Sequence, residues 1–429
     1  MKLPKVIWQF DLLRGLAVLA VMLFHMGNNW RSAILPRYTT WGWTGVDLFF
    51  VLSGFLITGI LLETKADPAY FQNFYARRIL RIWPLYFTLL VVFMLVLPWV
   101  SPRLAAPSVT TAYPRWAYLL FVQNFFRQHK VLGPLSVTWS LAVEEQYYIV
   151  WPLMVFLLSV KRLKLLLLVL VLAGPIAALI TTRSGNQFDF TPFHIDGLAI
   201  GSLLAIFVRN SVASAIRKIG LGALVGSAVG IALQLGTHST WPQFFLLSVA
   251  FGSVLCLAIT TTFIRRNRFL CYTGKISYGL YLLHLPSFDL VRSDRVRTVL
   301  PHGPLANDLS YTAIAFATAY AAATASWFCI EKPILRLKER FSRSGNAKSA
   351  YAGRTAPSQI VSLDPFLWID GLIHGNSRWC AAKLKRRASR LFGQCLMNRS
   401  AKKAAIASAT DAAPLKSATV SSTPGHTNR

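Results

Sequence analysis

The segment LLLLVLVL at residues 165–172 decides the fold class. It forms the centre of an apolar stretch over residues 163–181, and a helix of about 20 apolar residues crosses the hydrocarbon core of a bilayer. A strand of a membrane β-barrel would alternate apolar and polar residues, and this segment does not. We therefore predict a membrane-spanning α-helix here.

Comparable stretches occur along most of the chain, so the predicted fold class is all-α, a polytopic membrane helix bundle with about ten transmembrane helices. The predicted spans are residues 9–27, 43–62, 82–100, 138–158, 163–181, 192–208, 218–236, 242–263, 272–290 and 308–328. Residues 1–335 are the predicted transmembrane domain, and residues 336–429 are predicted to be a basic, partly disordered cytoplasmic tail.

Composition excludes several classes of protein. Of the 429 residues, 54% are hydrophobic and 14% are charged, whereas about 25% are charged in a typical soluble domain. The formal net charge of +29 is compatible with a nucleic-acid binder, but the apolar content argues against that class, and no nucleic-acid partner is expected. The five cysteines show no CxxC spacing, so we expect neither a metal site nor a disulfide framework.

Basic residues concentrate in alternate joints between the predicted spans. They occupy the joints near residues 77–81, 161–164, 209–218 and 265–268, whereas the joint at 237–241 has no Lys or Arg. The positive-inside rule therefore predicts that both termini are cytoplasmic. The long joint over residues 101–137 contains WAYLLFVQNFF (116–126) and is expected to form a short re-entrant or interfacial segment.

Carboxylates fall inside the predicted spans, where each costs at least about 2.5 kcal/mol at mid-bilayer unless it is paired or hydrated. Five of them are Asp11, Asp47, Glu144, Glu145 and Asp196. Such placement is typical of a polar cavity inside a helix bundle, so we expect one here.

Arg14 and His25 are eleven positions apart in the first predicted span. This spacing corresponds to a rise of about 16 Å and a net rotation of roughly 20°, so both side chains lie on one face of a helix. Arg14 can instead extend to the inner interface and pair with Asp11. A buried histidine in a bundle that also buries acids indicates proton handling. Glu144 and Glu145 enter at the depth predicted for His25, and since adjacent helical residues diverge by about 100°, at most one of them faces it.

Arg77, Arg78 and Arg81 cluster at the start of the third span, and Arg77 and Arg81 share a helix face. Two interpretations are open. The cluster can set the membrane topology through its positive charge. It can also clamp a phosphate group, because guanidinium binds phosphate through two parallel hydrogen bonds.

Other residues of the spans are interpreted structurally. Asp47 lies near the outer end of its span, where it can cap or orient a neighbour, and Ser53 is interpreted as a hydrogen bond between helices. His284 is interpreted as a core residue. A GxxxGxxxG face in the seventh span predicts close helix packing and consists of Gly222, Gly226 and Gly230.

A set of motifs occurs together and in order along the chain. The motifs are RGLAVLAVMLFH (14–25), GVDLFFVLSGFLI (45–57), YARRILRIWPLY (75–86), WSLAVEEQYYIVWP (139–152), DGLAIGSLLA (196–205), YTGKISYGLYLLHLP (272–286) and IEKP (330–333). As a set they closely resemble the acyltransferase 3 family of bacterial membrane O-acyltransferases. The resemblance implies a multi-pass enzyme of ten or eleven helices in the bacterial inner (cytoplasmic) membrane.

The resemblance also implies a reaction. The enzyme would transfer an acyl group, expected to be acetyl, from cytoplasmic acyl-CoA to a hydroxyl of a cell-surface glycan such as exopolysaccharide, O-antigen or a lipid-linked saccharide. Acyl-CoA is then a co-substrate, no permanently bound cofactor is expected, and the partners are acyl-CoA, the glycan acceptor and membrane lipids. Many relatives add a C-terminal esterase-like domain of the SGNH type, which is not expected within residues 331–429.

The site residues follow from the family motifs, matched one by one. The family's arginine and histidine of helix 1 match Arg14 and His25, its basic motif matches Arg77, Arg78 and Arg81, and its glutamate motif matches Glu144 and Glu145. A basic residue often precedes the DG motif in the family, and here His194 stands two residues ahead of Asp196.

A hydroxyl is a poor nucleophile near neutral pH and needs a base on its proton. His25 is the candidate, as a general base or as an acyl-imidazole, with Glu144 or Glu145 holding its tautomer or stabilising the imidazolium. Arg14 would line the path of the donor. The arginine cluster would hold the CoA phosphates, and Asp47 and Asp196 are expected to contribute to substrate or donor binding.

Two other function classes compete with this prediction. A secondary transporter of a sugar or an organic anion also buries acids, Arg and His at mid-membrane, but no repeat between the halves of the chain is evident. A non-catalytic membrane module, such as a sensor or scaffold, would leave the buried ionisable groups without a purpose and ranks last.

Overall fold

The computed structural model describes residues 7–27, 29–30, 35–100, 114–126, 133–181, 190–234, 241–261, 265–291, 296, 298–301 and 303–337. No β-strand occurs among these residues, so the all-α prediction is confirmed. Apolar runs form helices because a helix satisfies every backbone polar group within its own segment. The tail predicted over residues 336–429 lies outside the described residues apart from its first two, Arg336 and Leu337.

The helical elements follow the predicted spans in order. The N-terminal half holds α1 (Trp8–Gly27), α2 (Leu35–Thr39), η1 (Thr40–Thr44), α3 (Gly45–Thr64), α4 (Tyr70–Val91), η2 (Val92–Val96), α5 (Leu97–Val100), α7 (Arg115–Leu119), η3 (Gln123–Phe125), α8 (Thr138–Leu157) and α9 (Val160–Thr181). The remainder holds η4 (Thr191–Phe193), α10 (Ile195–Asn210), α11 (Ala213–Gln234), α12 (Trp241–Thr260), α13 (Arg268–Lys275), α14 (Ser277–Val291), α16 (Pro304–Ser326), η5 (Trp327–Glu331) and α17 (Lys332–Arg336).

The predicted count of about ten transmembrane helices is not confirmed. In the described part of the chain, six helices are long and apolar enough to cross a membrane: Trp8–Gly27, Thr40–Thr64, Tyr70–Val100, Ala213–Gln234, Gln243–Thr260 and Pro304–Arg336. Helices α10 and α14 have 16 and 15 residues, which is shorter than the roughly 20 that a bilayer requires. Helix α8 has 20 residues, but it includes the polar run Glu144, Glu145 and Gln146.

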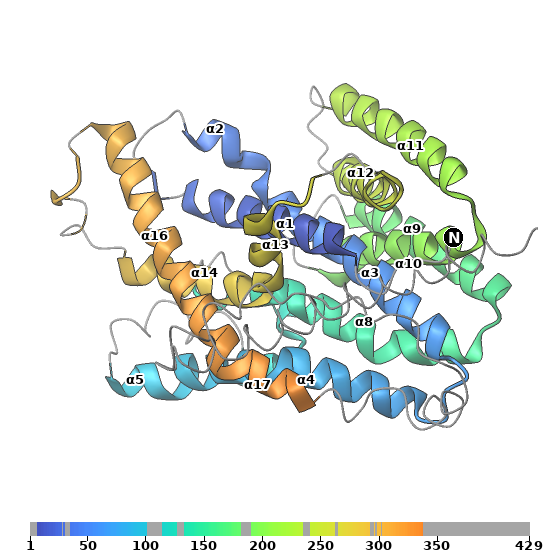
Figure 1. The fold of residues 1–429 in the computed structure, drawn as a ribbon, viewed down its shortest axis with the longest axis horizontal. Helices are drawn as coiled ribbons and strands as arrows, with labels where there is room; N and C mark the ends of the chain where they lie inside the picture. Colours follow the sequence, from blue (N-terminus) through green and yellow to red (C-terminus); the bar gives the residue numbers. More distant parts are fainter. Residues whose placement is uncertain are drawn as a thin grey trace, which may run out of the picture. The chain divides into compact units, whose positions relative to one another are not determined.

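Helix α1 occupies the middle of the helix arrangement, beside α3 and α13 (Figure 1). It also packs against α14, which packs against α16 in turn. Helix α3 packs against α8, α10 and α12, and α4 contacts α3, η5 and α17. As a result, α1, α3, α4, α8 and α14 each turn one side toward a common interior, where the candidate site lies.

The segment predicted to be re-entrant forms two short helical turns, α7 and η3, that pack back onto the helices. The hydroxyl of Tyr86 in α4 donates a hydrogen bond to the carbonyl oxygen of Tyr118 at 2.8 Å. The Gln146 amide in α8 donates to the carbonyl oxygen of Phe121 at 2.7 Å. Phe121 has a φ of 55°, a left-handed backbone conformation that is uncommon for a residue other than glycine. These contacts tie α4 and α8 to the same short segment.

The crossing of α3 and α10 requires glycine on both helices. A Cβ atom added at Gly54 would lie 2.0 Å from the carbonyl oxygen of Leu198, and one added at Gly201 would lie 2.1 Å from that of Val51. Close packing predicted at the GxxxGxxxG face of α11 was wrong at two of its three positions. A Cβ atom at Gly222 or Gly226 would meet nothing within 4 Å, and only Gly230 contacts a neighbouring helix, through Leu246.

Gly201→Ala should destabilise the protein, because the added methyl group collides with backbone atoms that cannot turn aside. Overpacking of this kind costs about 1–3 kcal/mol, which should appear as a lower Tm of the purified protein in detergent. Gly226→Ala is the matched control, since its methyl group enters open space and alanine favours a helix over glycine by about 1 kcal/mol. Equal Tm values for the two variants would contradict the close crossing.

Candidate active site

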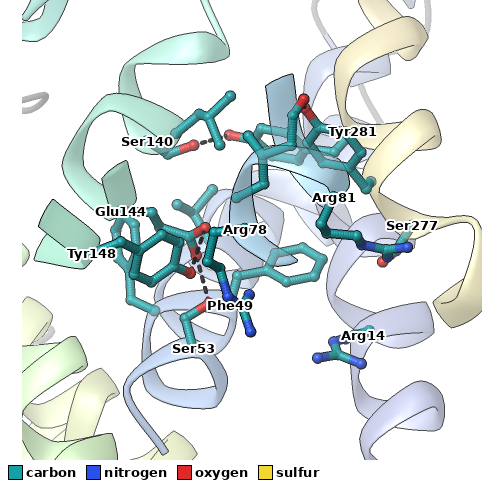
Figure 2. Close-up of a pocket in the computed structure, with 15 residues that line it drawn as sticks. Arg14, Phe49, Ser53, Arg78, Arg81, Ser140, Glu144, Tyr148, Ser277 and Tyr281 are labelled. Atoms are coloured by element: carbon teal, nitrogen blue, oxygen red, sulfur yellow. Dashed lines mark hydrogen bonds between the residues drawn. The ribbon is translucent and has the colours of Figure 1, made fainter. Parts of the chain in front are cut away.

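A cavity of about 130 Å³ lies among α1, α3, α4, α8 and α14, and we name it the arginine pocket. Figure 2 shows Arg14 on one side of this pocket, with Arg78 and the α8 side chains opposite. Its lining includes the polar and charged side chains of Arg14, Arg78, Arg81, Ser53, Glu144 and Tyr148. The cavity predicted from the buried charges therefore exists, and four helices supply these six side chains.

Glu144 is held by hydrogen bonds inside the arginine pocket. Ser53 Oγ donates to Glu144 Oε1 at 2.7 Å, and the Tyr148 hydroxyl donates to Glu144 Oε2 at 3.1 Å (Figure 2). The Ser53 bond joins α3 to α8, so its interpretation as a hydrogen bond between helices is confirmed. Because both carboxylate oxygens accept a bond, Glu144 is fixed in orientation in a pocket that three arginines also line.

A second cavity, of about 310 Å³, shares Arg14, Arg78 and Arg81 with the arginine pocket, and we name it the mouth cavity. Arg77 and Lys275 add two further cations to its lining. Asp67 also lines it, but its carboxylate already accepts hydrogen bonds from the Ala69 amide and the Asn73 side chain. The two adjacent cavities are therefore lined by five cations and two carboxylates, which favours a ligand with several negative charges.

The three shared arginines are held in different ways. Arg14 pairs with Asp11 at 3.4 Å, as one of the two interpretations of its sequence position predicted. Arg81 lies 4.0 Å from Glu331, a carboxylate that is 3% exposed. Arg78 is in no ion pair among the described residues and lies over the ring of Tyr148, 5.5 Å from its centroid. The guanidinium of Arg78 is therefore the one best able to accept an incoming anion without losing a carboxylate partner.

Sequence reasoning missed the role of Glu331, which lies in the π-helical segment η5. The signal was present, because the IEKP motif contains this residue. No spacing rule connects it to α4, 250 residues earlier in the chain.

His25 lies against a second histidine from α14. Its Nδ1 atom is 3.1 Å from Nε2 of His284 and 3.0 Å from the carbonyl oxygen of Val21. His284 is fully buried, so its interpretation as a core residue is right about burial, but the contact with His25 was not predicted. Arg14 lines the arginine pocket together with Ser277 of α14. Arg14 and His25 both face α14, which confirms their predicted shared face.

The prediction that Glu144 or Glu145 faces His25 was wrong. Glu144 points to Ser53 of α3, and Glu145 Oε2 accepts a hydrogen bond from the Trp83 indole of α4 at 3.3 Å. The two carboxylates diverge as helical neighbours should. Helix α8 packs against α3, whereas the C-terminal part of α1 meets α14. No described contact joins His25 to either glutamate.

The histidine pair lies next to the arginine pocket but does not line it. Tyr281 separates the two, because it lines the pocket and its ring centroid lies 6.0 Å from that of His284. The Tyr281 hydroxyl is 2.6 Å from Ser140 Oγ, also at the pocket wall (Figure 2). His25 itself is partly exposed. The described contacts therefore link His25 to the pocket wall through His284 and then Tyr281.

Asp47 and Asp196 lie together in a separate buried cluster. Asp47 Oδ1 is 3.4 Å from Nδ1 of His194, and Asp196 Oδ1 accepts a hydrogen bond from the Gly197 amide at 2.8 Å. Both aspartates are 2% exposed, and neither lines the arginine pocket or the mouth cavity. Their predicted part in substrate or donor binding stays a prediction, and the structure gives them His194 as a shared neighbour. Within the described residues, no three His, Cys, Asp or Glu side chains converge as a metal site would require.

Comparison with known proteins identifies relatives along most of the chain. Residues 7–328 match the family model described as an acyltransferase domain, acyltransferase 3. The chain is 34% identical over 318 residues to the peptidoglycan O-acetyltransferase OatA of Listeria monocytogenes, which covers 67% of this chain and 50% of that protein. It is 29% identical over 312 residues to the candidate peptidoglycan O-acetyltransferase YrhL of Bacillus subtilis, covering 64% of this chain and 48% of the relative. The chain spans about half the length of these curated relatives. No solved structure matches it.

Proposed function

The chain belongs to the acyltransferase 3 family, and on that premise we propose that it transfers an acetyl group from acyl-CoA to a hydroxyl of a cell-surface glycan. The observation that carries the proposal is the pair of adjacent cavities, whose lining holds five cationic side chains and includes Tyr281, a direct neighbour of the histidine pair. The names of the relatives support acetyl as the acyl group and add peptidoglycan to the candidate acceptors.

The mouth cavity is the proposed site for the phosphate groups of CoA. Arg77, Arg78, Arg81 and Lys275 line it, and guanidinium groups bind phosphate oxygens in a bidentate way. The positive-inside rule predicts that this end of α4 faces the cytoplasm, where acyl-CoA is found. The pantetheine arm then extends past Arg14 through the arginine pocket, with its thioester directed toward Tyr281 and the histidine pair.

His25 is the proposed general base. The hydroxyl oxygen of the glycan attacks the thioester carbonyl carbon while Nε2 of His25 takes the hydroxyl proton. The carbon–sulfur bond then breaks, and CoA leaves as a thiolate that becomes the thiol once it is protonated. The partial exposure of His25 supports access by an acceptor from the side predicted to lie outside the cytoplasm. The proposed location is the bacterial inner membrane, with both termini cytoplasmic.

The test is a transfer assay with the purified full chain in lipid nanodiscs, acetyl-CoA labelled in its acetyl group, and glycan fragments as acceptors. The proposal expects label in ester linkage on the glycan and release of free CoA in equal amount. Mass spectrometry of surface glycans from cells with and without the gene gives the same answer in the cell. Counterflow of a labelled sugar across vesicles without any turnover of acetyl-CoA would instead indicate transport and would overturn the proposal.

A further inference from the structure

The hydrogen bonds around the two histidines determine which ring nitrogen carries a proton. His284 Nδ1 lies 2.8 Å from the carbonyl oxygen of Tyr281 and 3.1 Å from that of Leu280. A carbonyl oxygen only accepts hydrogen bonds, so Nδ1 of His284 must carry the proton. In a neutral imidazole, the other nitrogen, Nε2, is then an acceptor.

The same reasoning applies to His25. Its Nδ1 lies 3.0 Å from the carbonyl oxygen of Val21 and 3.1 Å from Nε2 of His284. Both of these neighbours are acceptors, so Nδ1 of His25 is the donor to both. Nε2 of His25 therefore keeps its lone pair. The two assignments are consistent with each other, and no described contact of either ring is to a carboxylate that would favour an imidazolium.

We propose that His284 is a positioning residue for His25. It accepts the Nδ1–H bond, orients the ring so that Nε2 meets the substrate, and stabilises the imidazolium that forms when Nε2 takes the hydroxyl proton. In a Ser-His-Asp triad an aspartate performs this part, and the orienting bond to Nδ1–H is what keeps the reactive nitrogen unprotonated. Here a neutral imidazole replaces the carboxylate, so no net negative charge is buried beside the base. This inference rests on the proposed function, in which His25 is the base.

Helix α14 holds the His284 ring in a fixed orientation, as a positioning residue requires. The His284 side chain is fully buried, and its ring packs against Phe288, with centroids 5.6 Å apart. Its Nδ1 is held by two carbonyl oxygens of its own helix, so the ring cannot rotate without losing both bonds. The lone pair on Nε2 is therefore presented to His25 in a fixed direction.

The experiment compares His284→Leu, His284→Gln and the matched control Ser287→Ala. Ser287 lies one turn further along α14, is also buried, and donates only to the Leu283 carbonyl oxygen. We expect His284→Leu to lower kcat by about 10²-fold with little change in KM for acetyl-CoA, because the base is misoriented but the donor site is intact. The amide oxygen of His284→Gln can accept the Nδ1–H bond, so the kcat of this variant should be at least about tenfold higher than that of His284→Leu. Ser287→Ala should retain the wild-type kcat.

Nitrogen-15 NMR of histidine-labelled wild-type protein adds a readout that is independent of activity. Signals assigned by loss in His25→Gln and His284→Gln should show a proton on Nδ1 and none on Nε2 in both rings. A proton on Nε2 of His25 would overturn the inference even if the enzyme is active. Equal kcat in the Leu and Gln variants, or a wild-type kcat in the Leu variant, would also overturn it. If the wild type transfers no acetyl group at all, the proposed function fails, and the nitrogen-15 signals still decide the hydrogen-bond assignment.

Discussion

His25→Ala is expected to lower the kcat of acetyl transfer by about 10²–10⁴-fold, the usual contribution of a positioned general base. Alanine removes the only group that takes the hydroxyl proton in the proposed reaction. The donor site lies elsewhere, among the arginines of α1 and α4. Binding of acetyl-CoA, measured by isothermal titration with the purified variant, should therefore stay close to that of the wild type.

The control for this variant is Leu16→Ala on the same helix. Leu16 is 44% exposed and lies outside both cavities, so its truncation should leave kcat unchanged. Both variants should accumulate in the membrane at wild-type levels, because His25 is only partly buried. Acetyl transfer by His25→Ala at more than about a tenth of the wild-type rate would reject His25 as the base.

Arg78→Gln is expected to weaken binding of acetyl-CoA by about 10–100-fold, seen as a higher KM, with a smaller effect on kcat. A hydrogen bond to a charged group contributes about 1.5–3 kcal/mol. Arg78 has no described ion pair to lose, so the whole loss of free energy should appear in the binding of the incoming anion. Arg81→Gln should show a similar rise in KM, accompanied by a lower Tm, because Glu331 would then be buried without its partner.

A truncated donor separates phosphate binding from other effects. S-acetyl-N-acetylcysteamine carries the thioester but no phosphate, so wild type and Arg78→Gln should use it equally well. Arg162→Gln is the matched charge control, because Arg162 is an exposed arginine of α9 that lines neither cavity. If Arg78→Gln lost equal activity with acetyl-CoA and with the truncated donor, Arg78 would not recognise the phosphates.

Much of the fold could be predicted because a bilayer imposes a strong and local constraint. The helix starting at Val160 follows directly from its run of leucines and valines. The helices near 195–210 and 277–291 were predicted as well, but they are shorter than full spans. Hydropathy could not show the length of these two helices, because a helix end that is polar or rich in glycine has the same low hydropathy as a loop. Glycine spacing was misleading because it shows only that close packing is possible. The neighbouring helix decides whether close packing occurs, as it does at Gly201 but not at Gly226.

The candidate site was predictable residue by residue but not contact by contact. Helical periodicity correctly put Arg14 and His25 on one face, since both belong to a single helix. It could not say that this face meets α14, so the contact with His284 was missed and a glutamate was expected in its place. Glu331 was missed for the same reason. Pairings between helices depend on how the bundle closes, and one sequence does not encode that in any local pattern.

Labelling with bromoacetyl-CoA, followed by peptide mass spectrometry, tests directly whether acyl-CoA reaches His25 through the arginine pocket. This compound places a reactive carbon where the acetyl methyl group would lie, one bond from the thioester carbonyl, and alkylates the nucleophile nearest to it with loss of bromide. We expect one modification, on His25, that excess CoA prevents and that is lost in Arg78→Gln at low reagent concentration. A CoA-protected modification on Ser53 or Tyr148, with His25 unmodified, would contradict this expectation.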